Sequence, residues 1–147
     1  GALFHIVSDI ERIGDHAENV ADAAVQRKEM GVSFSKAAQR ELGEMMDKVN
    51  LILRYSFEMF STGSDRYAGD VQLLENSIDE LERRIQTSHI ERLTRNDCTP
   101  EASMIFSDIV SGLERVADHA TNIAFCLYEA EEETEYVRRR EQKALAG

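Results

Sequence analysis

The sequence predicts an all-α protein, an antiparallel up-down bundle of four long helices. Apolar residues recur three and four positions apart in four separate segments, which is the spacing of one face of a helix. The segments are separated by short stretches with glycine or capping residues, and short loops make consecutive helices antiparallel neighbours. A single proline among 147 residues agrees with a helical fold.

The first two helices are marked by apolar stripes and by end signals. Gly31 follows the first stripe and Gly63 the second, and glycine is the residue best suited to a left-handed C-terminal cap. Ser33 or Ser35 is the expected N-cap of the second helix. The first stripe consists of Ile6, Ile10, Ile13, Ala17, Val20 and Ala24, and the second of Phe34, Ala38, Leu42, Met45, Val49, Leu53, Phe57 and Phe60.

The third and fourth helices follow the same rules. Ser64 or Asp65 is the expected N-cap of the third. Thr99-Pro100-Glu101 opens the fourth with a capping hydroxyl, a proline at the first helical position and an acid near the positive helix end. The third stripe is Val71, Leu74, Ile78, Leu81 and Ile85, and the fourth is Ile105, Ile109, Leu113, Val116, Ala120, Ile123 and Leu127. Charged residues 131–147 are expected to extend the last helix and then fray.

The charge balance limits the partners. A net charge of −11 argues against nucleic acid or an anionic membrane surface as a partner, and it suits cation binding. Cys98 and Cys126 lack metal-type spacing, which favours a reduced, cytoplasmic setting. No segment is long and apolar enough for a transmembrane helix. Since the chain starts without methionine inside a helical pattern, we expect a fragment whose upstream part could tether it to the inner face of a membrane.

One eleven-residue string occurs twice in the chain. Residues 11–21 read E-R-I-G-D-H-A-E-N-V-A, and residues 114–124 read E-R-V-A-D-H-A-T-N-I-A. Packing alone would repeat the apolar positions of a helix, but not its glutamate, aspartate, histidine and asparagine. An internal repeat shows how a fold is built, and here the repeated unit carries polar chemistry. We therefore interpret the shared polar residues as functional.

Acidic pairs four residues apart, which stack on one helix face, occur in three of the helices. They are Glu11 with Asp15, Glu75 with Asp79, and Glu114 with Asp118. If the third and fourth helices are neighbours, their pairs converge on a site for a hard cation such as Mg²⁺, Ca²⁺, Mn²⁺ or iron. Glu82, His16 and His119 are further candidate ligands. The alternative is a solvated face with Arg12 and Arg115 as salt-bridge partners, and for the histidines ordinary helix contacts.

The repeated motif and Glu75-Asn76-Ser77-Ile78-Asp79 resemble motifs of the PhoU family of phosphate-uptake regulators, over nearly all residues up to about 130. Such proteins have two three-helix repeats. The resemblance thus implies that residues 1–31 are the last helix of a first repeat, residues 32–130 a complete second repeat and residues 131–147 a charged helical tail. By the same resemblance, Glu75, Asp79, Glu114 and Asp118 form one metal site, and Glu11 and Asp15 half of another.

The resemblance also implies a non-catalytic regulatory role in phosphate transport, with a multinuclear cluster of iron or zinc. The residue sequence of the motif is most similar to that of cytoplasmic C-terminal domains of sodium/phosphate cotransporters. Other members of the group work with a phosphate transporter and a sensor kinase, and these are the partners that the resemblance implies.

Two other functions are compatible with a helical bundle. A ferritin-like di-metal oxidase or storage protein needs Glu-x-x-His motifs, and none of the four histidines has an acid three residues before it. A purely structural interaction domain would have scattered carboxylates. If the family resemblance holds, the first helix lacks the two partners of its own repeat. We then expect a homodimer, because Phe4, Val7 and Val25 lie off the first stripe and need another surface.

Overall fold

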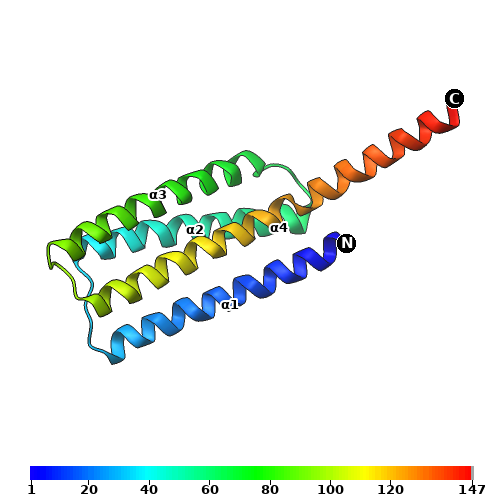
Figure 1. The fold of residues 1–147 in the computed structure, drawn as a ribbon. Coiled ribbons are helices and arrows are strands. Elements are labelled where there is room, and N and C mark those ends of the chain that lie inside the picture. Colours follow the sequence, from blue (N-terminus) through cyan, green and yellow to red (C-terminus); the bar gives the residue numbers. More distant parts are fainter. Residues whose placement is uncertain (147) are drawn as a thin grey trace.

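The fold is all-α, as the sequence predicts. The computed structural model describes the backbone of residues 1–146 and all of their side chains except those of residues 2 and 129–133. Within this part the chain forms α1 (Ala2–Glu29), α2 (Lys36–Thr62), α3 (Ala68–Thr94) and α4 (Pro100–Ala146), and no strand (Figure 1). The charged tail is helical up to Ala146, and Gly147, the last residue of that predicted segment, lies outside the described residues.

The helix α4 is the centre of the bundle. Helices α2 and α3 pack on one side of α4 and α1 packs antiparallel to it on the other, while the end of α4 extends past the other helices (Figure 1). Within the described part of the chain, α1 approaches α4 to within 8 Å between Cα atoms, but approaches neither α2 nor α3 that closely. The molecule is therefore a three-helix unit, α2–α3–α4, with α1 added to its outer side.

Burial confirms the predicted stripe of α4 and corrects that of α1. From Ile105 to Ile123, every residue of the α4 stripe is less than a tenth exposed. On α1, however, Ile10, Ala17 and Ala24 are exposed, although the sequence pattern placed them in the stripe. The reason is that α1 has a single neighbour, so only one narrow strip is covered. That strip contains Ile6, Asp9, Ile13, His16, Val20 and Ala23.

The helix ends agree with the expected signals at all but one place. The Ser35 hydroxyl accepts a hydrogen bond from the Ala38 N–H, and Gly31 and Gly63 have φ of +64° and +66°. The Thr99 hydroxyl likewise accepts from the Ala102 N–H at 3.1 Å. The predicted N-cap of α3 is wrong. Ser64 Oγ accepts from the Arg66 N–H within the preceding turn, which delays the start of α3 to Ala68.

Among the described residues, no helix combines the length and the apolar composition needed to cross a bilayer.

Candidate metal centre

Three of the predicted ligands meet between α3 and α4. Asp79, Glu114 and Asp118 each offer an oxygen atom, and these atoms lie within 4.8 Å of one another. Glu114 and Asp118 are one turn apart on the same face of α4, and Asp79 faces them from α3. All three side chains are half-buried, so water covers them only in part. The arrangement agrees with the convergence that the sequence spacing predicts.

The carboxyl groups of this cluster perturb one another strongly. The pKa of Glu114 is raised to about 8, first because the group is buried and then because of its hydrogen bond with Asp118 and the charge of Asp118. Burial also raises the pKa of Glu75 and of Glu82, and the charges of Asp79 and Asp118 add to both shifts. Glu75 and Glu82 thus belong to the same acidic face, although among the described residues Asp79 alone joins Glu114 and Asp118 in the closest group.

Among the described residues no arginine forms an ion pair with the cluster, although the charges of Arg115 and Arg83 partly offset the raised pKa of Glu82. In the part of the chain that the structure describes, neither Arg12 nor Arg115 forms an ion pair, so the salt-bridge explanation of these carboxylates finds no support. The raised pKa of Glu114 means that its ionised form is disfavoured at this place, first by burial and then by the neighbouring carboxyl groups. The donor set consists of carboxylate oxygens alone, which fits a hard cation with oxygen ligands.

The second predicted acidic pair is not part of such a group. Glu11 and Asp15 are exposed on α1 and line an open hollow of about 360 Å³ together with Ser8, Arg12 and His16. Among the described residues, no third acid or histidine comes close enough to complete a three-ligand site with them. Their role as half of a metal site stays a prediction.

The two histidines of the repeat lie in the α1–α4 interface. The rings of His16 and His119 stack with their centroids 5.5 Å apart and their planes 14° from parallel. His119 Nδ1 lies 2.8 Å from Asp9 Oδ1, and the Asn122 amide donates to the same oxygen at 3.3 Å. Burial, followed by the charge of His119, lowers the pKa of His16. Both histidines are therefore held by helix packing, and their role as metal ligands stays a prediction.

This stacking relates the two copies of the repeated string to each other. His16 and His119 occupy the same position in the two strings, and α1 and α4 run antiparallel (Figure 1). Equivalent positions that meet in an antiparallel pair imply a local two-fold axis between the rings. The side chains on the two sides of this axis differ. His119 contacts Asp9, whereas the position equivalent to Asp9 is Gly112, which has no side chain that could contact His16. The polar network therefore exists on one side of the axis.

Two residues outside the predicted candidates make polar contacts in the structure. Asp9 contacts His119 in the α1–α4 interface, and His89 is buried between α3 and α4. Asp9 is spaced three and four residues from Ile6 and Ile13, which would have placed it in the interface. His89 follows Ile85 by four residues, and this spacing extends the buried stripe of α3.

His89 is only 7% exposed. Its Nε2 lies 2.7 Å from Ser103 Oγ, and its ring stacks on Phe106 with centroids 5.2 Å apart. Burial lowers the pKa of His89, and the nearby charge of Arg92 lowers it further. The residue belongs to the packed end of the bundle.

Comparison with known proteins agrees with the motifs. The family model described as PhoU domain matches residues 42–127. A phosphate-specific transport system accessory protein PhoU homolog from Xylella fastidiosa is 35% identical over 127 residues, which are 84% of this chain and 50% of that protein. A homolog from Thermotoga maritima is 28% identical over 116 residues, which are 79% of this chain and 49% of that protein.

The chain spans about half the length of these curated relatives. No solved structure matches it significantly.

Proposed function

Because this chain belongs to the PhoU family, we propose that it is a non-catalytic regulatory domain that acts with a phosphate transporter. The relatives that support this role are named as accessory proteins of phosphate-specific transport systems. A cytoplasmic location beside the membrane domain of a transporter, such as a sodium/phosphate cotransporter, belongs to the same proposal, as does a sensor kinase as a further partner.

We further propose that the domain binds a metal ion between α3 and α4. The observation that carries this proposal is the approach of Asp79, Glu114 and Asp118 to within 4.8 Å of one another. These three residues would hold the ion, with Glu75 and Glu82 beside them as additional acids. Magnesium, manganese and ferric iron fit oxygen ligands, whereas zinc more often takes nitrogen and sulfur as well.

The consequence of such binding would be structural. A bound cation supplies positive charge, which offsets the repulsion among the carboxylates. The bound charge would also lower the pKa of Glu114, which burial and Asp118 raise to about 8. Since Asp79 belongs to α3 and the other two ligands to α4, their shared ion would fix the distance between these helices. The surface that α3 and α4 present to a partner would then depend on the metal.

The outer face of α1 supports the division into repeats. Leu3, Val7 and Ile10 are 71%, 57% and 45% exposed, and Gly14, Ala17 and Ala21 continue the same exposed strip. Each of these positions has an equivalent on α4 in the second copy of the repeat, and all of the equivalent α4 residues are buried in the core shared with α2 and α3. These residues are Phe106, Val110, Leu113, Ala117, Ala120 and Ala124.

This correspondence suggests that α1 has a face suited to two further helices. We accordingly propose that residues 1–31 end a first three-helix unit and that residues 32–130 form a second. When the face is uncovered, pairing of two chains through α1 would bury it, which is the basis for proposing a homodimer.

Metal analysis of protein purified without a metal-affinity tag tests the proposed site. Replacement of Glu114 and Asp118 by alanine should sharply lower the amount of bound iron, manganese or zinc per chain. The matched control is the Glu80→Ala, Asp22→Ala double variant, which removes two exposed acids outside the cluster. Equal metal content in both double variants and in the original chain would rule out the α3–α4 site.

A further inference from the structure

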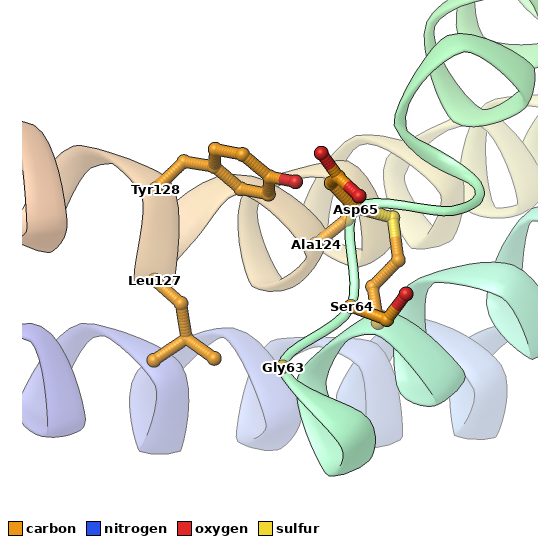
Figure 2. A pocket seen from close by; sticks show the side chains of 7 residues that line it. Gly63, Ser64, Asp65, Ala124, Leu127 and Tyr128 are labelled. Carbon is orange, nitrogen blue, oxygen red and sulfur yellow. The ribbon is translucent and has the colours of Figure 1, made fainter.

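A hollow of about 210 Å³ lies where α4 leaves the bundle, opposite the turn between α2 and α3 (Figure 2). Its floor is apolar and consists of Met59, Ala124 and Leu127. Its rim is polar and carries Ser64, Asp65 and Tyr128. None of these residues belongs to the candidate metal centre, so the hollow is a separate feature of the fold.

The rim has an acid without a counter-charge. In Figure 2 the Tyr128 hydroxyl points toward the Asp65 carboxylate, and within the described residues neither side chain has a hydrogen-bond partner. Asp65 does not cap α3, which begins three residues later. The neighbouring Arg66 does not neutralise it either, because its guanidinium lies over the Tyr67 ring, 5.1 Å from the centroid.

The surroundings of the hollow add to its negative potential. Gly63 ends α2, so the carbonyl groups of the last turn of this helix carry partial negative charge here. A ligand that fits must combine a positive group with a short apolar stem.

We infer that this hollow binds an alkylammonium or alkylguanidinium group. The cation lies beside the Asp65 carboxylate and over one face of the Tyr128 ring, which attracts it through the negative face of the aromatic system. The alkyl stem covers Ala124 and Leu127, in the way that lysine and arginine stems cover apolar surface. The ligand is either a free amine or a lysine or arginine side chain of a partner protein.

Nuclear magnetic resonance titrations of the full chain distinguish these sources. The first probe is n-butylammonium, with 1-butanol as its neutral counterpart. The second is the peptide acetyl-Ala-Leu-Lys-Leu-Ala-amide, with norleucine in place of lysine as its counterpart. Saturable shifts of the Gly63 and Ser64 amide signals with n-butylammonium indicate that a free amine suffices. Saturable shifts with the lysine peptide alone indicate a side chain of a partner. Equal shifts with the neutral counterparts, or no saturable shift with either cationic probe, overturn the inference.

Variants locate the binding. Asp65→Asn and Tyr128→Leu should each weaken the binding roughly fivefold, as expected for one partly exposed charge or ring contact. Tyr128→Phe keeps the ring and should retain most of the affinity. Asp70→Asn, an exposed acid of α3 outside the hollow, changes the net charge equally and should have no effect. If Asp70→Asn weakens binding as much as Asp65→Asn, general negative charge explains the result and the proposed site is wrong.

Discussion

Val20 of α1 occupies the space where a side chain at Gly112 of α4 would begin. A Cβ atom at Gly112 would lie 2.6 Å from Val20 Cγ2, closer than carbon atoms in contact can be. Gly112 is the position equivalent to Asp9, whose carboxylate contacts His119 on the other side of the local two-fold axis. The two halves of the α1–α4 interface are thus held together by different contacts, a polar contact on one side and close apolar packing on the other.

Replacement of Gly112 by alanine should destabilise the protein. Alanine gains up to about 1 kcal/mol over glycine inside a helix, but overpacking costs about 1–3 kcal/mol. Val20 can relieve the contact only poorly, because a β-branched side chain in a helix has one strongly preferred rotamer. Urea unfolding should therefore show a net loss of stability.

Gly43→Ala is the matched control, because a Cβ atom there meets nothing within 4 Å. This variant should be as stable as the original chain or more stable. The Val20→Ala substitution should restore part of the loss in the Gly112→Ala background. A Gly112→Ala variant as stable as Gly43→Ala would show that the interface has room that the structure does not indicate.

The stability of the metal-free protein should fall as the pH rises from about 5 to about 8. In the unfolded chain Glu114 has its ordinary pKa of 4.5, whereas in the fold its pKa is about 8. Between these values the folded state binds the additional proton, so raising the pH favours unfolding. Glu114→Gln cannot ionise and should flatten this dependence, making the variant more stable than the original chain at pH 8.

Unfolding free energies measured across this pH range check the prediction. Glu80→Gln removes an exposed carboxylate of α3 outside the cluster and is the control. If it flattens the dependence as much as Glu114→Gln does, the effect comes from net charge and not from the cluster.

Hard cations should raise the melting temperature, and a chelator should lower it again. A ligand that binds only the folded state stabilises it by about 2.7 kcal/mol at a concentration one hundred times its Kd. Thermal unfolding with Mg²⁺, Mn²⁺, Zn²⁺ and ferric iron would rank the ions. The Glu114→Ala, Asp118→Ala double variant should lose most of the shift. Equal shifts in this variant would place any bound metal elsewhere.

Acidification should weaken the end of the bundle around His89. The pKa of His89 lies below 6.5 in the fold because the ring is buried beside Arg92, while Glu41 opposes the shift. The neutral ring is therefore favoured in the folded state above pH 6.5, and this stability is lost as the pH falls below that value. His89→Gln should remove this part of the pH dependence. The free energy of unfolding should be measured in the Glu114→Gln background, because ionisation of Glu114 changes stability in the opposite direction. His5→Gln, at an exposed position, should not remove it.

The chain should self-associate through the outer face of α1. Light scattering across a concentration series should approach twice the monomer mass of 16.6 kDa. Val7→Lys combined with Ile10→Lys should shift the equilibrium toward the monomer, because both side chains belong to the exposed strip. Leu73→Lys, which changes a leucine of α3 that is 70% exposed, should not shift it. A constant monomer mass at high concentration would exclude the dimer.

The four helices could be predicted from the sequence because their signals are local. Ser35, Thr99 and Gly63 act within one helical turn, and the apolar period is visible in any single segment. The repeated string and the motif from Glu75 to Asp79 were likewise enough to suggest the family. The convergence of Asp79 with Glu114 and Asp118 followed from the acidic spacing together with the expectation that α3 and α4 are neighbours.

The identity of the neighbour at each helix face was decided by the tertiary structure. Asp9 and His119 are 110 residues apart, and no local pattern pairs them. The apolar stripe is buried on α4, but on α1 Ile10, Ala17 and Ala24 of the corresponding stripe are exposed, because α4 packs on three helices and α1 on one. Periodicity states which residues share a face of a helix. Whether that face is covered depends on which distant helices pack against it, and so the exposure of Ile10 could be known only from the fold.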